Sequence, residues 1–497
     1  MAKDLRLTFS EVGLFIWCNN FWGGLLSIKK RALPKEIYLA FLLSIFVLPS
    51  NLSAGSVETH LSVSSILLKD SVESSLPVNA KWSFSAIDIE TGKYLIDAGN
   101  ARDISLIPGS IVKLFVTAAI LDMDAKEKIG LDTIIAHDGK ISKGELQGNL
   151  YLKGTGNAFL SEIELKKAVE EILSKDISKI SGDIIVDDTF FDTRGWESRY
   201  PGPAYSAPSA LGLDMHTVSI TVSGKPSNIK INPPNEAIRV SFNHDVKPNI
   251  RQVDDLTYEV SGVILDSAII RKRFPLKNPG LYAGGTLMTL LKESGVTIKG
   301  VVRKGELPPQ IAKIFRIKSK DLSEIVKDTN NNSLNVVAEN LLLLLGAKRF
   351  GLPGTIEKGV MAVREFLSCL GLPSDGIAFA DGSGLSPDNR IASKHIVSFL
   401  RKASEKPWFK TFYESLPRAG MDGTLKGIGY ENGRIRAKTG QTPDIYCLAG
   451  YFERNDGRKI AFSYMVNVPG AELIWKENNK IFALLSQVGD IGRLENP

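Results

Sequence analysis

The strand patterns of this chain fall into two groups that lie far apart along the sequence. Trp82, Phe84 and Ala86 alternate with neighbours of opposite orientation, and a turn signal at residues 90–93 leads into a second apolar stretch, which together predict a hairpin. Three more strand patterns follow near the end, at 434–439, 446–452 and 459–467. This grouping predicts one antiparallel sheet of five strands that an insertion splits in the sequence.

The residues between the two groups have a different texture. Short strand-like pieces recur from about 125 to 320, namely 182–187, 218–222, 238–242 and 258–262. Helical spacing returns at 322–345, with an Asn-rich break at 330–333, and then at 358–370, 394–402 and 474–487. We therefore expect an α/β (α+β) fold with a discontinuous domain over 56–124 and 321–497, and one or two inserted β-rich domains over 125–320.

The N-terminal segment has the order of a secretory signal. A basic cluster at 29–31 precedes an apolar run from Ile37 to Leu48, and small residues follow at 53–55, which predicts cleavage after Ala54. The run is short for a membrane span. Leu52 is bulkier than the usual residue before such a cut, so an uncleaved anchor is the alternative, and the aromatic-rich first 28 residues leave the translation start open. We set residues 1–54 aside as extension and signal peptide, and expect export to the periplasm or cell-wall space.

Charge and histidine spacing exclude two classes of function. Residues 1–54 carry six Lys or Arg and three Asp or Glu, so their removal lowers the formal net charge from +6 to +3. That balance is compatible with peripheral contact to an anionic membrane surface, but it does not indicate nucleic-acid binding. The five histidines are scattered, with no two at metal-ligand spacing, so we expect no metal and no cofactor.

Ser110 and Lys113 are the first candidate for chemistry. Pro108 and Gly109 break the chain just before Ser110, and apolar residues then recur at helical spacing, so Ser110 is expected to open a helix with Lys113 one turn later. A lysine kept neutral by burial can accept the proton of a serine hydroxyl. The S-x-x-K pattern occurs three times here, and only Ser110 stands at a predicted helix start.

Two later motifs complete a set. Ser333 and Asn335 form an S-x-N triplet between predicted helices, where a helix cap is the alternative reading. Lys438, Thr439 and Gly440 end a predicted strand, where the lysine and hydroxyl could grip a carboxylate and the glycine permits close backbone approach; a solvated strand end is the alternative. S-x-x-K, S-x-N and K-T-G in this order are the signature of penicillin-binding proteins and serine β-lactamases.

The chain resembles D-alanyl-D-alanine carboxypeptidase/endopeptidases of the penicillin-binding protein 4 type, the low-molecular-mass class C enzymes. The likeness runs from about residue 80 to 490 and includes the long insertion. Further matching stretches are 182–188, 205–210, 381–386 with Asn389 and Arg390, 423–425, and 437–440 with Tyr446 and 448–450. The chain departs from the pattern at 441–444, which reads Gln-Thr-Pro-Asp, and at Leu334, where Asp is common.

The resemblance implies roles for the catalytic residues. Ser110 would attack the carbonyl of a D-alanine residue with Lys113 as base, and Ser333 would relay a proton to the leaving amine. Asn335 would hold the acyl side of the substrate and steady Lys113. The product of the first step would be an acyl-enzyme that water hydrolyses.

The resemblance also implies substrate contacts. Lys438 and Thr439 would bind the substrate carboxylate, next to Gly440. The backbone amides of Ser110 and Gln441 would bind the oxyanion. Asp187, or its neighbour Asp188, would receive the amino end of a diamino acid side chain, with a surface strand carboxylate as the alternative.

The expected partners follow from the same resemblance. They are peptidoglycan stem peptides as substrates and β-lactam antibiotics as covalent inhibitors, whereas the balance of carboxypeptidase and endopeptidase action and the oligomeric state stay open. A serine β-lactamase or esterase and a non-catalytic cell-wall scaffold are the alternatives. A Ser-His-Asp hydrolase is disfavoured because no G-x-S-x-G elbow is present.

Overall fold

A computed structural model describes residues 73–74, 76–200, 205–223, 228–243, 247–262, 269–309, 311–373, 375–427 and 433–471, with Ile474, Ile481 and Leu485. These residues all fall within one compact unit of the chain. The predicted signal segment and most of the predicted helix at 474–487 lie outside the described residues.

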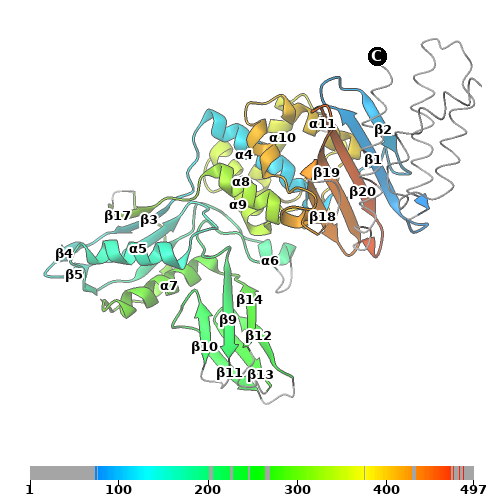
Figure 1. Ribbon diagram of the computed structural model, residues 1–497. Coiled ribbons are helices and arrows are strands. Elements are labelled where there is room, and N and C mark those ends of the chain that lie inside the picture. The colour runs from blue at the N-terminus through cyan, green and yellow to red at the C-terminus, as the bar shows by residue number, and fades with distance from the viewer. Residues whose placement is uncertain are drawn as a thin grey trace, which may run out of the picture. The chain divides into compact units, whose positions relative to one another are not determined.

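A five-stranded antiparallel sheet joins the two ends of the described chain (Figure 1). Its order is β18-β19-β20-β1-β2, and β1 pairs with β20 over eight residue pairs from Lys81–Asn467 to Asp88–Ile460. The strands are β1 (Lys81–Asp88), β2 (Tyr94–Ala98), β18 (Ile435–Thr442), β19 (Ile445–Glu453) and β20 (Lys459–Asn467). The predicted pairing of two early strands with three late ones is confirmed.

Helices pack on one face of this sheet around α4. Every residue of α4 from Val112 to Leu121 is buried, because apolar and small side chains surround the whole first part of this helix. Phe115 of α4 packs on Phe399 of α11 with 4.3 Å between ring centroids, and the same core includes Tyr451 of β19. The helices are α4 (Val112–Lys126), α8 (Leu322–Asn332), α9 (Asn335–Phe350), α10 (Ile356–Cys369), α11 (Ser393–Ser404) and α12 (Phe409–Ser415). Because α4 is buried in this core, the residues directly before it, which include Ser110, are held in a fixed position.

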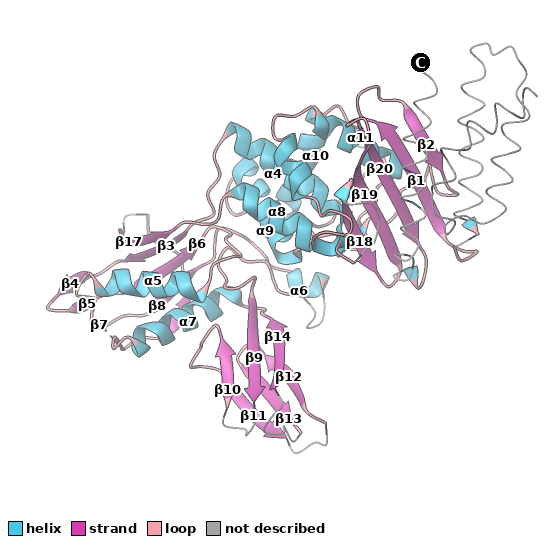
Figure 2. Ribbon diagram, in the orientation of Figure 1, coloured by secondary structure: helices cyan, strands magenta, loops and turns pink. Residues whose placement is uncertain are grey.

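The residues between these parts of the chain form separate sheets (Figure 2). One five-stranded sheet has the order β16-β8-β6-β3-β17, and a four-stranded sheet has the order β15-β7-β5-β4. Their strands are β3 (Thr133–His137), β4 (Lys140–Ser142), β5 (Glu145–Gln147), β6 (Leu150–Gly154), β7 (Lys179–Ile180), β8 (Ile184–Asp187), β15 (Thr297–Ile298), β16 (Val302–Lys304) and β17 (Ala312–Ile317).

Two three-stranded sheets share a smaller core. Their orders are β10-β9-β14 and β11-β13-β12, and buried residues such as Val218, Ile220 and Tyr258 pack between them. The strands are β9 (Thr217–Ser223), β10 (Ile229–Asn232), β11 (Arg239–Asn243), β12 (Asn249–Asp254), β13 (Thr257–Ser261) and β14 (Ile269–Pro275). The short helix α6 (Trp196–Arg199) precedes them.

The insertion also contains two long helices that the sequence analysis missed. Helix α5 (Glu162–Leu173) begins with a complete capping box between Ser161 and Glu164, a local signal that was overlooked. Helix α7 (Pro279–Glu293) contains glycines that weaken its helical pattern. An added Cβ at Gly284 would lie 2.5 Å from a side-chain atom of Val186, so this glycine allows α7 to pack closely on the sheet. The expectation of a β-rich insertion was therefore incomplete.

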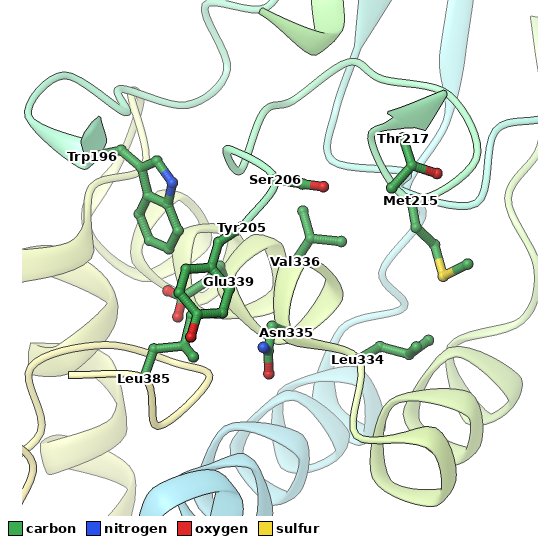
Figure 3. Close-up of a pocket in the computed structure, with 10 residues that line it drawn as sticks. All are labelled: Trp196, Tyr205, Ser206, Met215, Thr217, Leu334, Asn335, Val336, Glu339 and Leu385. Carbon is green, nitrogen blue, oxygen red and sulfur yellow. The ribbon is translucent and has the colours of Figure 1, made fainter. Parts of the chain in front are cut away.

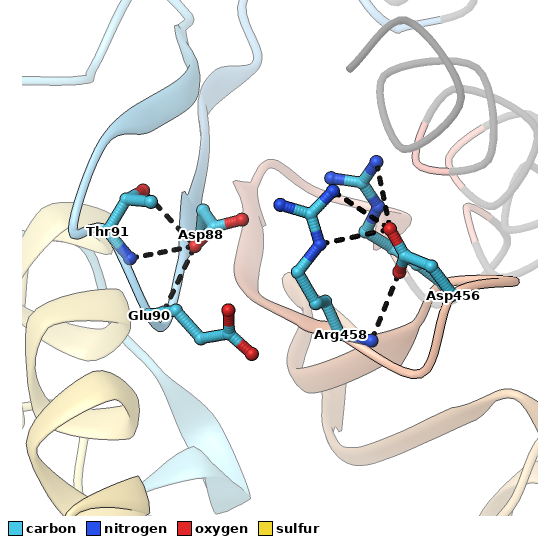
Figure 4. Close-up of polar contacts among 6 residues, drawn as sticks. Asp88, Glu90, Thr91, Asp456 and Arg458 are labelled. Carbon is cyan, nitrogen blue, oxygen red and sulfur yellow. Dashed lines mark hydrogen bonds and ion pairs between the residues drawn. The ribbon is translucent and has the colours of Figure 1, made fainter. Parts of the chain in front are cut away.

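Side chains fix the turns of two hairpins of the five-stranded antiparallel sheet β18-β19-β20-β1-β2 (Figure 4). Asp88 Oδ1 accepts hydrogen bonds from the backbone N of Glu90 at 3.0 Å and of Thr91 at 2.9 Å. In the turn between β19 and β20, Asp456 accepts from the backbone N of Arg458 at 3.1 Å and from its guanidinium. These local bonds fix the turns that connect β1 to β2 and β19 to β20.

Candidate active site

Ser110 stands in a single 3-10 turn, Gly109–Ile111, directly before α4. Gly109 has φ of +53°, a conformation that side chains other than glycine disfavour, and Gly440 of β18 lies against it. An added Cβ at Gly440 would lie 2.4 Å from the Pro108 carbonyl O and 3.2 Å from the Ser110 N. The two glycines therefore allow the backbone of β18 to lie close to Ser110. The prediction that Ser110 stands at the start of a helix is confirmed.

Lys113 connects three parts of the cluster. Its side chain is fully buried, and its Nζ lies 2.8 Å from Ser110 Oγ, 2.8 Å from Asn335 Oδ1 and 2.5 Å from the Ser383 carbonyl O. Burial lowers the pKa of Lys113 to about 7, against the opposing effect of the carboxylates of Asp381 and Glu339. A substantial fraction of Lys113 is therefore neutral near pH 7 and can accept the serine proton.

Lys438 and Ser333 form the second pair. Ser333 ends α8 in the left-handed conformation, with φ of +57°, and Lys438 is fully buried on β18. The Nζ of Lys438 donates to Ser333 Oγ at 2.8 Å and to the Thr439 carbonyl O at 2.8 Å. Burial lowers the pKa of Lys438 well below its usual value, and the nearby charge of Lys113 lowers it further.

Thr439 and Gln441 continue the strand past Lys438. The Thr439 hydroxyl donates to the Thr424 hydroxyl at 2.9 Å, which links β18 to the 423–425 turn. Gln441 is exposed and pairs with Tyr446 of β19, so the strand continues in register beyond Gly440 despite Pro443. An added Cβ at Gly109 would lie 3.6 Å from the Gln441 N. The backbone segments that carry the amides of Ser110 and Gln441 therefore lie next to each other.

Two buried carboxylates lie behind Lys113, and the sequence analysis assigned them no role. Glu339 follows Asn335 by one turn of α9, and it accepts hydrogen bonds from Ser383 N at 2.8 Å and from Gly382 N at 3.1 Å. Burial, with the neighbouring Asp381, raises the pKa of Glu339 to about 7. A lone carboxylate within the apolar run of α9 was the signal that could have identified it.

A pocket of about 200 Å³ opens beside Asn335 (Figure 3). Leu334, Asn335 and Val336 come from the start of α9, whereas Trp196, Tyr205 and Met215 come from the chain between β8 and β9. Ser206, Thr217, Glu339 and Leu385 complete the lining. The pocket is largely apolar and lies next to a residue of the Ser110 cluster.

Asp187 is not brought together with these residues. Its side chain is fully buried at the end of β8, and it accepts from Lys153 Nζ at 2.7 Å, Thr189 Oγ1 at 2.6 Å and Leu307 N at 2.7 Å. Burial raises the pKa of Asp187, but the hydrogen bonds from Lys153 and Thr189 outweigh it and hold the pKa below its usual value. Its neighbour Asp188 is half-buried and pairs with Lys304 at 2.8 Å.

Within the described ranges, no three His, Cys, Asp or Glu side chains converge as ligands for a metal ion. No helix in the part of the chain that the structure describes is both long enough and apolar enough to cross a membrane.

Comparison with known sequences decides the class of the enzyme. The model of the D-Ala-D-Ala carboxypeptidase 3 (S13) family matches residues 64–487. The chain belongs to this family. It is therefore a hydrolase of the D-Ala-D-Ala carboxypeptidase type, as the three motifs in their order predicted.

Individual relatives agree with this membership. A D-alanyl-D-alanine carboxypeptidase of an Actinomadura species is 31% identical over 418 residues, which cover 77% of this chain and 76% of the relative. The D-alanyl-D-alanine carboxypeptidase DacB of Haemophilus influenzae is 26% identical over 79% of this chain and 86% of its own length. The crystal structure of penicillin binding protein 4 from the same organism matches with a TM-score of 0.71 at 24% identity, covering 84% of this chain and 99% of that chain. The predicted fold class is thereby confirmed.

Proposed function

We propose that Ser110 is the nucleophile of this carboxypeptidase and that Lys113 is its general base. The observation that carries the proposal is the 2.8 Å contact between Lys113 Nζ and Ser110 Oγ. Burial of the lysine supports it, because a base must be unprotonated to accept the serine proton at neutral pH.

The proposed reaction has two halves. Ser110 Oγ attacks the carbonyl carbon of a D-alanine residue, Lys113 takes the hydroxyl proton, and the amides of Ser110 and Gln441 donate to the oxyanion. The C–N bond then breaks, and Ser333 passes the proton that Lys113 took to the leaving amine. Water attacks the acyl-Ser110 ester and gives its proton to Lys113. The bond between the acyl carbon and Ser110 Oγ then breaks, Lys113 returns the proton to Ser110 Oγ, and the shortened peptide leaves with a free carboxylate.

The substrate we propose is the D-alanine end of a peptidoglycan stem peptide. Lys438 and Thr439 would bind the carboxylate of the leaving D-alanine, because both stand on the edge strand beside Ser110 and offer an amine and a hydroxyl as hydrogen-bond donors. Asn335 would hold the acyl side. Cleavage of cross-linked peptides, an endopeptidase reaction, uses the same atoms and is proposed as a second activity.

We also propose that β-lactams acylate Ser110 and form a long-lived adduct. The Haemophilus influenzae penicillin binding protein 4, which shares the fold, has been solved in complex with a novel β-lactam. A serine β-lactamase would instead release hydrolysed penicillin fast. The lifetime of the adduct therefore distinguishes the two.

The location and the division of the chain remain proposals of the same kind. We propose export to the periplasm or cell-wall space, with residues 1–54 as extension and signal peptide. We propose that 56–124 with 321–497 is the catalytic domain and 125–320 the insertion. The separate sheets formed by strands between Thr133 and Ile317 support this division.

The test compares the wild-type protein with Ser110→Ala. Both are incubated with a pentapeptide stem and with cross-linked muropeptides, and the products are read by mass spectrometry. We expect loss of one D-alanine from the pentapeptide with the wild type alone. Equal product from both proteins would contradict the assignment of Ser110, and cleavage of only one substrate would decide between carboxypeptidase and endopeptidase action.

A further inference from the structure

Tyr200 joins the insertion to the loop behind the active site. It directly follows helix α6, and its hydroxyl donates to Asp381 Oδ2 at 2.5 Å. The preceding residue, Arg199, donates from Nη1 to the Ala380 carbonyl O at 2.9 Å. The ring of Tyr200 packs on Trp196, with 4.3 Å between centroids. Consecutive side chains of the segment after β8 therefore hold consecutive residues of the 380–386 loop.

Asp381 is the organising residue of that loop. Its side chain is fully buried, and it accepts from Gly384 N at 2.8 Å, Ser386 N at 2.6 Å and Asn389 Nδ2 at 2.8 Å. Tyr200 adds the fourth donor to this carboxylate. A buried carboxylate that loses one donor is left with uncompensated charge in a medium of low dielectric, so every one of these bonds restrains the loop.

The loop in turn holds the proposed general base. Ser383 offers its carbonyl O to Lys113 Nζ at 2.5 Å, and its N–H is held by Glu339 at 2.8 Å. An added Cβ at Gly384 would lie 1.9 Å from the Gly109 carbonyl O, so the loop also lies directly against the turn that carries Ser110. A shift of the loop would move both the acceptor of Lys113 and the support of that turn.

We propose that Tyr200 is a positioning residue for the acylation of Ser110, acting through Asp381 and the Ser383 carbonyl on Lys113. The proposal rests on the proposed function of Ser110 and Lys113 and extends it to a residue outside the three motifs. It gives the insertion a part in the reaction, because the segment between β8 and β9 then fixes the geometry of the base.

The charges around Asp381 give the proposal a signature in pH. The titratable groups around Asp381 are Lys113 of α4, Glu339 of α9, and Tyr200 and Arg199 after β8. Lys438 of β18 interacts with Lys113. Asp381 and Glu339 raise the pKa of Lys113. The Tyr200 hydroxyl holds the Asp381 carboxylate and its loop in place behind Lys113. Without it the loop relaxes, the negative charge lies farther from the Lys113 ammonium, and the pKa of Lys113 falls.

The experiment measures the rate at which a fluorescent penicillin acylates the full-length protein, as a second-order rate constant between pH 5 and 9. The variants are Tyr200→Phe, Asp381→Asn and the double variant, with Ser110→Ala as the blank. Tyr151→Phe is the matched control. Tyr151 lies on strand β6, and its hydroxyl also donates to a carboxylate, that of Asp138, at 2.9 Å. Thermal unfolding of every variant checks that it is folded.

For Tyr200→Phe we expect an acylation rate about tenfold lower at pH 8, the scale of one hydrogen bond to a charged group. We also expect its acid limb to move to lower pH, and the double variant to lose no more than Asp381→Asn alone. Rates and a profile equal to those of the wild type would overturn the proposal, as would a loss no greater than that of Tyr151→Phe with an unmoved acid limb. If the wild type itself is not acylated, the proposed function fails first, and the two failures are thus separate.

Discussion

Lys438 of strand β18 and Ser333 between helices α8 and α9 are joined by a hydrogen bond of 2.8 Å, although 105 residues separate them in the chain. The bond links the sheet to the helices beside the Ser110 turn. Ser333 adopts the left-handed conformation at the end of α8, and its hydroxyl accepts this hydrogen bond from Lys438. The position therefore combines a backbone requirement with a chemical one.

These two requirements can be separated by substitution. Ser333→Gly removes the hydroxyl but tolerates φ of +57°, whereas Ser333→Ala removes the hydroxyl and keeps the strained backbone. We expect both to lower turnover of a D-Ala-D-Ala peptide by about 10² or more, the usual scale of a lost proton-transfer group. Both variants lose the hydrogen bond to Lys438, but only glycine relieves the left-handed backbone, so Ser333→Ala should lower the unfolding midpoint more than Ser333→Gly does. A Gly variant with full activity would remove Ser333 from the reaction.

The pKa of Lys113 predicts how acylation depends on pH. The lysine acts in its neutral form, and its pKa is about 7, so the second-order rate constant should rise with pH through about 7 and then level off. Lys113→Arg stays protonated throughout and should be inactive at every pH. Acylation that is constant from pH 5 to 9 in the wild type would contradict the role of Lys113 as base.

Glu339 should shift that profile. Its carboxylate raises the pKa of Lys113, so Glu339→Gln, which keeps an oxygen acceptor for Ser383 N, is expected to move the acid limb below pH 7. Glu339→Ala also strands the buried N–H groups of Gly382 and Ser383, and should lower the free energy of unfolding by about 1–3 kcal/mol for each unpaired group. Denaturant titration compares the two variants. If the acid limb of the pH profile does not move in Glu339→Gln, then Glu339 does not set the pKa of Lys113.

Local patterns in the sequence were enough to predict the sheet and the central cluster. Alternation around Phe84 and in the last three strands indicated the five-stranded sheet, and motif order selected Ser110, Ser333 and Lys438, which the structure brings together. Each single strand and each single motif is recognised from residues that are close in sequence. The residue types then fix the chemistry.

Contacts that form only in the folded chain could not be predicted in this way. The acceptor for Lys113 from the 380–386 loop is a backbone carbonyl, that of Ser383, which has no sequence signal. The contact of Tyr200 with Asp381 spans 181 residues. Asp187 was chosen as a strand-end carboxylate, but alternation alone cannot tell whether its strand faces solvent or a second layer.

Gly440 tests how closely the backbone of β18 must approach Ser110. In Gly440→Ala, the new methyl group would meet the Pro108 carbonyl O and the Ser110 N, so the strand must withdraw from the turn. We expect acylation to fall by about 10² to 10³, as when one oxyanion donor is lost. Gly457→Ala is the control: its Cβ would meet nothing within 4 Å, and because Gly457 has positive φ, only stability should fall. Equal acylation rates in the two variants would show that acylation does not require the backbone of β18 to lie this close to Ser110.

Asp187 gives the last prediction, which sets a structural role against a role in substrate selection. Its buried carboxylate is paired with Lys153, so Asp187→Ala leaves a cation without its partner and should lower the free energy of unfolding by about 3–5 kcal/mol. Glu259→Ala, which removes the more exposed pair with Arg251, should cost about 0–1 kcal/mol. We expect the ratio of cleavage rates for free-amine and amidated stem peptides to equal that of the wild type, because the Asp187 carboxylate is occupied within the protein. A ratio in Asp187→Ala that differs from that of the wild type would instead support a role of Asp187 in binding the substrate amine.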